Sequence, residues 1–413
     1  MKTIKLFISY GIIPVLIIEY FFLMFGFNIH RILVTPMILL MDMLSFILII
    51  KTLLSNNTTG TRLFMVWFII NIMSAVAYRY NGMPFSCYIS MLRPYIFPMF
   101  FFLLGIDKDV DKSLFYKYYL IASVFSFVVG IILYFTTPSF YLEYLSGIIS
   151  NNWQGGNSSV DYIVDTFRMG SFFGSSYAIS FLSVPAMCIA LGNTLKKGAH
   201  ENWLMFIVSI ISWLSALLCQ QRVAMAFSTF VIIYYYIISR SRVNGTYILT
   251  TGIVVGVIGI IAIIGTNDRY SFVLESLKNR TEEMSFIKAY EGSRTNQVVS
   301  TIAATDNFIL GDGIGARSSQ ARKIGKPGVS DVEYIRLLSE NGIIGLLLFL
   351  LITLCSIIRV FSCRREFFTE IMIIGFFLFA MIGSNALSIN HLYSTVFWFS
   401  LGTIWKRYKI NNK

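Results

Sequence analysis

Charged residues, cysteines and histidines are all scarce in this sequence. Only 13% of the 413 residues are charged, whereas soluble globular domains carry about 25%, so a water-soluble enzyme is excluded. The five cysteines occur singly, and neither they nor the three histidines show the spacing of a disulfide framework or a metal site. We therefore expect no metal and no cofactor.

Apolar residues, by contrast, make up 56% of the chain, with a mean hydropathy of +0.70 and with 37 Phe and 23 Tyr. They occur in long continuous runs and lack the ten-residue alternation of a membrane β-barrel. The sequence thus predicts an all-α polytopic membrane protein, one integral membrane domain over residues 1–413 with about twelve transmembrane helices. The predicted spans are 4–26, 32–54, 64–80, 85–105, 114–136, 172–193, 203–219, 222–239, 247–265, 343–361, 368–386 and 390–405.

The distribution of basic residues predicts the orientation. With both termini in the cytoplasm, the inner segments hold 18 basic residues, and the short outer connections hold only Arg31, Arg79, Arg168 and Arg222. Cytoplasmic loops carry such an excess in membrane proteins. The net charge of +12 is therefore a topology signal, and we expect no nucleic-acid partner.

Two predicted outer segments are too long to be simple connectors. Residues 137–171 include Asn151–Gly156, which is rich in groups that bind sugars, and residues 266–342 hold ten basic and ten acidic residues. Loops of this length usually have a function or are disordered. Helical periodicity at 270–288 and near 298–304 favours a folded loop on the outer face, and any chemistry is expected there.

Two outer arginines are candidate anion-binding groups. Arg222 follows Cys219-Gln220-Gln221 at a membrane boundary, and Arg294 lies in Glu291–Asn296. Each has an ordinary alternative, because Arg222 fits a snorkelling anchor and Arg294 a loop charge paired with Glu291. The functional alternative is a guanidinium that binds phosphate oxygens through two parallel hydrogen bonds.

A glycine cluster and a basic stretch follow. Gly311, Gly313 and Gly315 permit a tight turn against another element or a ligand. The spacing is not a dinucleotide motif, because no strand precedes it. Arg317 and Arg322, with two lysines after them, either line an anionic headgroup or form a solvated charge run.

Two further groups are candidate proton acceptors. Ser330–Glu333 predicts a helix start in which Ser330 is the N-cap and Glu333 closes a capping box. On that interpretation Asp331 is only a first-turn acid. The alternative is that Asp331 is a general base, with His391 in the short outer turn 388–391 as the second candidate.

The order of these motifs resembles the hallmark region of the O-antigen polymerase and O-antigen ligase superfamily. The resemblance covers residues 168–350 and the overall hydropathy, and its motifs are loose one by one. They are Arg168–Ser176, Gln221-Arg222-Val223-Ala224, Ser293-Arg294, Gly311-Asp312-Gly313-Ile314-Gly315 and Asp331-x-x-Tyr334-Ile335-x-x-Leu338-x-Glu340-x-Gly342-Ile343-Ile344-Gly345-Leu346.

The resemblance implies a metal-independent, GT-C-like glycosyltransferase of the bacterial inner membrane that acts at the periplasmic face. It would transfer the growing glycan from undecaprenyl pyrophosphate to the non-reducing end of an incoming lipid-linked repeat unit, with a chain-length regulator as partner. Asp331-Val332 replaces the His-Asn pair of the ligase branch, which favours the polymerase branch and leaves the general base open. The resemblance assigns catalysis and pyrophosphate binding to the following residues: Asp331, His391, Arg222, Arg294, Arg168, Arg317, Arg322 and Tyr334.

Two alternatives stay open. A lipid-linked oligosaccharide flippase has a similar number of spans, but it needs charges inside the spans and two related halves, which this sequence shows little of. A ligase-type glycosyltransferase is the other alternative.

Overall fold

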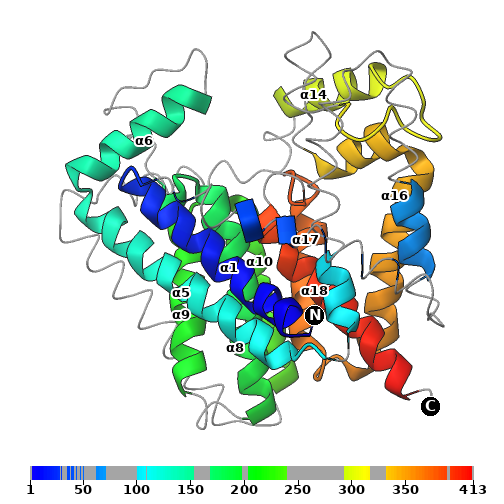
Figure 1. Ribbon diagram of the computed structural model, residues 1–413, viewed down its shortest axis with the longest axis horizontal. Helices are drawn as coiled ribbons and strands as arrows, with labels where there is room; N and C mark the ends of the chain where they lie inside the picture. The colour runs from blue at the N-terminus through cyan, green and yellow to red at the C-terminus, as the bar shows by residue number, and fades with distance from the viewer. Residues whose placement is uncertain are drawn as a thin grey trace. The chain divides into compact units, whose positions relative to one another are not determined.

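All the secondary structure that the computed structural model describes is helical (Figure 1). It describes residues 2–27, 62–70, 100–107, 109–152, 168–197, 203–239, 293–316, 332–387 and 391–411, with a few positions between 29 and 50. The helices are α1 (Lys2–Met24), α5 (Lys112–Thr136), α6 (Ser139–Asn152), α8 (Ser176–Lys197), α9 (Trp203–Leu218), α10 (Arg222–Ser239), α14 (Ser293–Ala303), α16 (Glu333–Val360), α17 (Phe368–Ala380) and α18 (His391–Asn411), with short 3-10 turns at Ser171–Phe173 and Phe361–Cys363.

Four of these helical stretches are long and apolar enough to cross a membrane: Lys112–Thr136, Ser176–Lys196, Arg222–Ser239 and Glu333–Cys363. Shorter apolar helices lie at Ile13–Met24, Trp203–Leu218 and Phe368–Ala380. The prediction of an all-helical protein is therefore confirmed for the described residues, and the four long apolar helices are consistent with a membrane protein. The predicted spans 32–54, 64–80, 85–105 and 247–265 lie wholly or largely outside them.

The chain forms two compact units. The first comprises Met1–Ser9, Met37–Lys112 and Phe286–Lys413, and the second comprises Tyr10–Pro36 and Ser113–Ser285.

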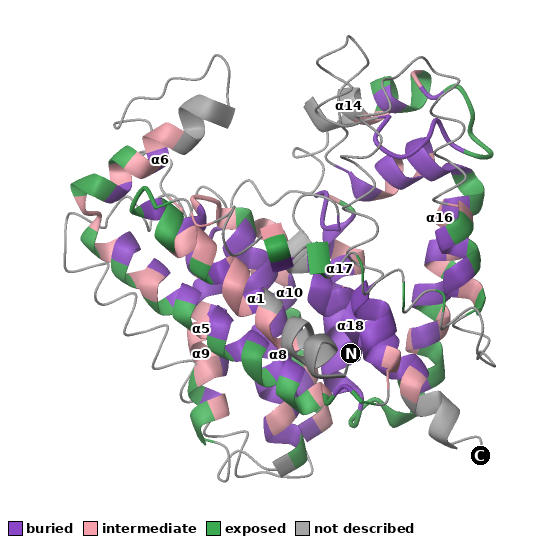
Figure 2. Ribbon diagram, viewed as in Figure 1, coloured by how far each residue is buried: buried purple, intermediate pink, exposed green. Residues whose placement is uncertain are grey.

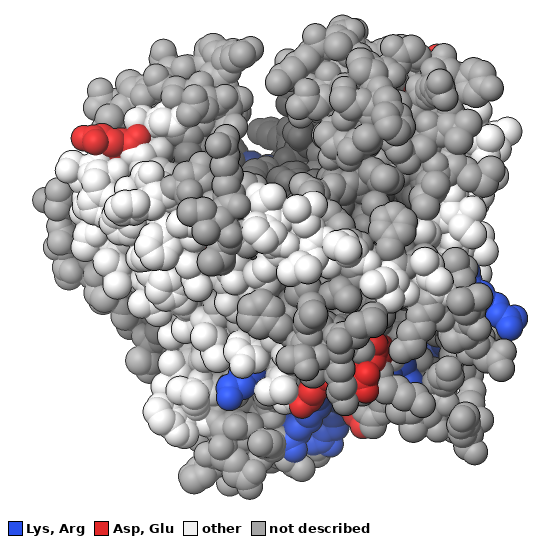
Figure 3. All heavy atoms as spheres, in the orientation of Figure 1, with Lys and Arg blue, Asp and Glu red and all other residues white. Residues whose placement is uncertain are grey.

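Helix α8 is the core of the second unit. Every residue from 178 to 192 is buried, as expected of a helix that is apolar on all sides. It packs most extensively on α9 and also on α10, and Tyr119 of α5 donates a hydrogen bond to the carbonyl of Phe181 at 3.4 Å. Figure 3 shows mostly uncharged atoms over α5, and Glu143 on α6 is exposed.

Helices α17 and α18 form the core of the first unit and are largely buried (Figure 2). Helix α18 also meets the end of the helical stretch at 100–106, where two glycines lie in contact. A Cβ added to Gly105 would lie 2.5 Å from the carbonyl oxygen of Phe399, and one added to Gly402 would lie 2.2 Å from that of Phe102. Small residues allow such close approach between membrane helices.

Helix α16 bends at Gly342, where the backbone has φ 68° and ψ 179°. The bend separates a short polar part, Glu333–Asn341, from a long apolar part, Ile343–Val360, and the two parts run in different directions in Figure 1. The predicted span 343–361 begins directly after this bend, at the first residue of the apolar part.

Candidate functional site

The turn between α9 and α10, residues 219–221, presents Arg222 as the first residue of α10. Gln220 has a positive φ of 52°, which lets the chain reverse in three residues. Gln221 then donates a hydrogen bond from Nε2 to the hydroxyl of Ser176 at 2.7 Å, and this bond fixes the turn to the start of α8. Arg222 itself is half-buried.

The structure brings Arg168 to this same turn. The backbone amide of Met169 donates to the carbonyl of Leu218, the last residue of α9, at 3.1 Å. Arg168 lies close enough to Cys219 for its charge to act on the buried thiol. Two of the predicted pyrophosphate-binding arginines, Arg168 and Arg222, therefore lie at one end of the second unit; we call residues 168–169 and 219–222 the arginine turn.

Helix α6 holds the chain that leads out of the arginine turn. The hydroxyl of Tyr141 donates to the carbonyl of Ser171 at 2.8 Å, and that of Tyr144 donates to the carbonyl of Phe172 at 2.7 Å. Ser171 in turn donates to the carbonyl of Ser126 on α5 at 2.8 Å. Burial raises the pKa of Tyr144 to about 12, so this hydroxyl remains a donor even in moderately alkaline solution.

The sequence did not predict these tyrosines. Residues 137–171 were expected to be an outer loop, and they contain α6, while residues 153–167 of that loop lie outside the described residues. Pro138 immediately before the helix and two tyrosines three residues apart on one helix face were the available signals.

In the first unit, the two halves of the hallmark region pack directly on each other. The segment Phe308–Gly313 lies against Ser339–Ile344, and four backbone hydrogen bonds join them: Asp312 N to Ser339 O (2.8 Å), Gly313 N to Glu340 O (3.0 Å), Ile343 N to Phe308 O (2.8 Å) and Ile344 N to Ile309 O (3.5 Å). We call this contact the glycine crossing.

Only glycine fits at the two central positions of the crossing. A Cβ added to Gly311 would lie 2.3 Å from the carbonyl oxygen of Glu340, and one added to Gly342 would lie 2.1 Å from that of Ile309. Both glycines also have a positive φ, of 80° and 68°, which L side chains rarely adopt. Gly311, one of the glycines predicted to permit a tight turn, thus makes a close contact with another element.

Side chains fix the loop that makes this crossing. Asp312 is 4% exposed, and its Oδ1 accepts hydrogen bonds from the backbone amides of Asp306 (2.9 Å) and Asn307 (3.1 Å). Thr305 donates to the hydroxyl of Ser339 at 2.9 Å. Asp312 is therefore explained by loop structure, and nothing about it requires a ligand.

In the short part of α16, before the bend at Gly342, the buried Arg336 lies between the buried Glu333 and Glu340. The guanidinium of Arg336 donates to Glu333 Oε1 at 2.5 Å and to Glu340 Oε2 at 3.0 Å. The two carboxylates are 0% and 1% exposed. This carboxylate–arginine cluster adjoins the glycine crossing, because Glu340 belongs to both.

The predicted capping box at the start of α16 is wrong. The helix begins at Glu333 with Val332 at the N-cap, and no side chain caps it. Glu333 instead turns along the helix to Arg336, since residues three apart lie on one face. Ser330 and Asp331 lie outside the described residues.

Tyr334 connects α16 to α17. Its hydroxyl donates to the carbonyl of Leu378, in the last turn of α17, at 2.8 Å. This bond gives Tyr334 a structural role at the predicted site and leaves its ring half-buried.

The other predicted site residues are placed only in part. Arg294 is the second residue of α14 and His391 the first of α18, both in the first unit. The predicted periodicity near 298–304 is confirmed by α14, whereas Arg317 and Arg322 lie outside the described residues, as does the predicted helical segment at 270–288. Convergence of Arg222 with Arg294 stays a prediction.

No protein-family model and no curated protein matches the chain.

Chemically, the arginine turn holds two arginines, Arg168 and Arg222, and guanidinium groups suit oxygen-rich anions such as a phosphate or pyrophosphate. Among the described residues no cluster of three metal-ligating side chains occurs.

Proposed function

We propose that this protein is a surface-polysaccharide polymerase of the O-antigen polymerase type. It transfers the growing glycan from undecaprenyl pyrophosphate to an incoming lipid-linked repeat unit at the periplasmic face of a bacterial inner membrane. One observation carries the proposal: two loose motifs of the hallmark region, which 15 residues separate in the sequence, pack as one structure at Gly311 and Gly342. Chance matches to a motif pattern have no reason to be complementary in space.

The arginine turn supports the same proposal. The leaving undecaprenyl pyrophosphate concentrates negative charge, and an enzyme without a metal must stabilise that charge with fixed cations and hydrogen-bond donors. Arg168 and Arg222 lie at one turn whose backbone is fixed by Met169 and Gln221. We assign them to the pyrophosphate, together with Arg294, Arg317 and Arg322, and Tyr334 to the substrate side of α16.

The proposed reaction breaks the bond between the anomeric carbon of the donor glycan and the pyrophosphate oxygen. A hydroxyl oxygen of the acceptor forms the new bond to that carbon, and its proton passes to Asp331 or, as the second candidate, His391. Undecaprenyl pyrophosphate leaves with the electron pair of the broken bond. A positioned base of this kind contributes typically about 10²–10⁴-fold.

The proposal includes a topology. About twelve spans place both termini in the cytoplasm and residues 137–171 and 266–342 in the periplasm, in accordance with the basic residues counted above. The partners are membrane lipids, the undecaprenyl-pyrophosphate-linked oligosaccharide and a chain-length regulator.

Purified protein tests the activity. In mixed detergent micelles with lipid-linked repeat units from the source cells, the enzyme should produce a ladder of lengthened glycans on a gel. Arg222→Ala and Arg168→Ala should each reduce the ladder to single repeats, while the exposed Arg365 provides the matched control, Arg365→Ala, with the native ladder.

The outcomes separate the alternatives. A full ladder from Arg222→Ala removes that arginine from the mechanism. If the native protein lengthens nothing in micelles but moves lipid-linked oligosaccharide across the bilayer of sealed vesicles, it is a flippase.

A further inference from the structure

The long part of α16 has one exposed apolar face. Ile343, Leu347, Leu351, Leu354 and Ile358 recur at intervals of three or four residues, and each is between 45% and 71% exposed. Large aliphatic side chains on one face of an apolar helix are what a lipid-facing surface requires. Figure 2 shows this face as exposed patches beside buried ones along α16.

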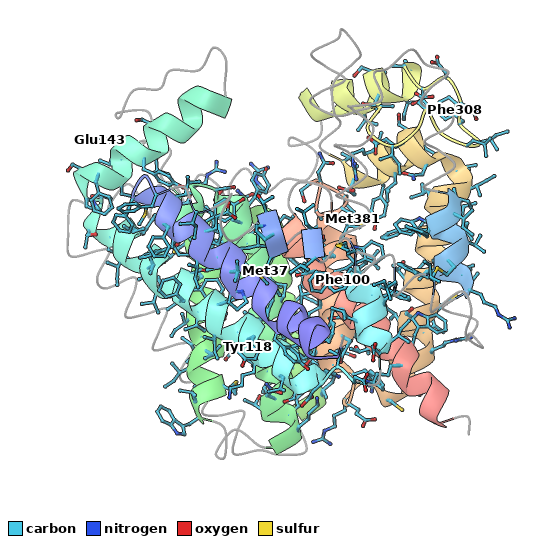
Figure 4. The ribbon with its side chains drawn as sticks, viewed as in Figure 1. Met37, Phe100, Tyr118, Glu143, Phe308 and Met381 are labelled. Carbon is cyan, nitrogen blue, oxygen red and sulfur yellow. The ribbon has the colours of Figure 1, made fainter. Side chains whose placement is uncertain are left out.

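The loop of the glycine crossing continues this face beyond the helix. Phe308, Ile309 and Leu310 are 44%, 62% and 52% exposed, three large apolar side chains in succession. The carbonyls of Phe308 and Ile309 accept hydrogen bonds from the first two amides of the long part of α16. Phe308 lies close to the bend of α16 in Figure 4.

The length of the apolar part of α16 indicates how deep in the bilayer this loop lies. Ile343–Val360 comprises 18 residues, which span about 27 Å at 1.5 Å per residue. Arg359, whose guanidinium lies 4.5 Å from the centre of the Trp405 ring, marks one end. A hydrocarbon core of about 30 Å that begins there extends to the bend at Gly342 and to the loop beside it.

The backbone of the loop is compatible with that depth. Non-helical backbone is tolerated in hydrocarbon only where its polar groups are satisfied within the protein. The four bonds of the crossing satisfy amides of Asp312, Gly313, Ile343 and Ile344, and the side chain of Asn307 accepts hydrogen bonds from the amides of Ile309 and Leu310 at 3.1 and 3.0 Å.

We propose that Phe308-Ile309-Leu310 is a membrane-embedded wedge, in contact with lipid acyl chains at the end of the bilayer core farthest from Arg359. The exposed Asp306 and Asn307 directly before it mark the boundary with water. The wedge fixes the position of the bend in α16 at the edge of the bilayer core. It thereby keeps the carboxylate–arginine cluster just outside the hydrocarbon. This inference does not depend on the proposed glycosyltransferase activity.

Fluorescence quenching tests the wedge. An environment-sensitive thiol label is attached to Ile309→Cys and, as the matched control three residues away, to Asp306→Cys, in vesicles of phosphatidylethanolamine and phosphatidylglycerol. The unsubstituted chain, labelled in parallel, gives the background from its own cysteines. One quencher is a phospholipid with a nitroxide near the top of the acyl chain, and the other is aqueous iodide.

The label at 309 should be quenched more strongly by the lipid nitroxide than by iodide, and the label at 306 should show the opposite order. Iodide quenching at 309 as strong as at 306 overturns the wedge, and so does protection of 309 from both quenchers, which would indicate a protein partner. If Ile309→Cys does not fold, Leu310→Cys provides the same comparison.

Discussion

Gly311 and Gly342 occupy positions where each glycine lies against the backbone on the other side of the crossing: Gly311 against Glu340, and Gly342 against Ile309. Their relationship explains why the bend in α16 and the tight turn 31 residues earlier occur together, because neither backbone could take its path if the other carried a side chain.

The first prediction concerns this contact. Gly311→Ala and Gly342→Ala should each lower the thermal unfolding temperature of the detergent-solubilised protein, because a positive φ costs an alanine about 1–2 kcal/mol and a backbone clash adds to that cost. Gly26→Ala is the control, since Gly26 has a φ of 82° and no atom within 4 Å of an added Cβ. Equal losses at all three glycines would show that the clash is not real.

The second prediction concerns the buried cluster. Arg336→Met leaves Glu333 and Glu340 buried without their cation, and it should cost about 3–5 kcal/mol of unfolding free energy. Adding Glu333→Gln and Glu340→Gln should restore much of that loss, as measured by chemical denaturation of the purified variants. A triple variant no more stable than Arg336→Met would contradict the charge pairing.

The third prediction concerns the tyrosines that hold the arginine turn. Tyr141→Phe and Tyr144→Phe remove hydroxyl donors to the carbonyls of Ser171 and Phe172, and each should cost about 1 kcal/mol. Because these bonds position the chain next to Arg168, both variants should also form shorter glycan ladders. Tyr118→Phe on the exposed face of α5 is the control and should change neither the stability nor the ladder.

The fourth prediction concerns Lys406, whose ammonium donates to the carbonyls of Asp107 (2.6 Å) and Val110 (3.0 Å) and ties α18 to that segment. Lys406→Met should destabilise the protein by about 1.5–3 kcal/mol. The control is Lys117→Met, on an exposed position of α5.

The pH dependence of this effect follows from the pKa of Lys406, which burial lowers from its ordinary value of 10.5 while Asp107, Asp111 and Asp109 oppose the shift. The unfolded chain then binds more protons than the folded chain just below pH 10.5, so the free energy of unfolding should rise with pH in that window. Lys406→Met should lack this rise. An identical slope in both proteins would refute the assignment.

Much of the helical framework was predictable, because long apolar runs identify helices by composition alone. The span 222–239 coincides with α10, and the predicted span 343–361 begins where the apolar part of α16 begins, although the bend at Gly342 itself was not predicted. The contact of Gly311 with the backbone of Glu340 was not predictable. A glycine in the sequence indicates that the chain can turn there, but it does not indicate which other backbone segment lies against the turn.

The pairing of side chains was the other feature that the sequence could not predict. Glu333 suited a capping box as well as an ion pair, and only the position of the helix start decides between them. Likewise, Arg168 and Arg222 are far apart in sequence, and the backbone bond from Met169 to Leu218 that brings them to one turn has no sequence signature.

The bend in α16 makes the hydrogen bonds at Ile343 and Ile344 sensitive to the thickness of the bilayer in the proposed topology. A membrane thinner than the apolar length of a spanning helix tilts that helix, and in the proposed topology a tilt of the long part of α16 acts on the hydrogen bonds from Ile343 and Ile344 to the neighbouring loop. Either that loop follows the helix or those two bonds break, so in the proposed topology the lipid chain length acts directly on the glycine crossing.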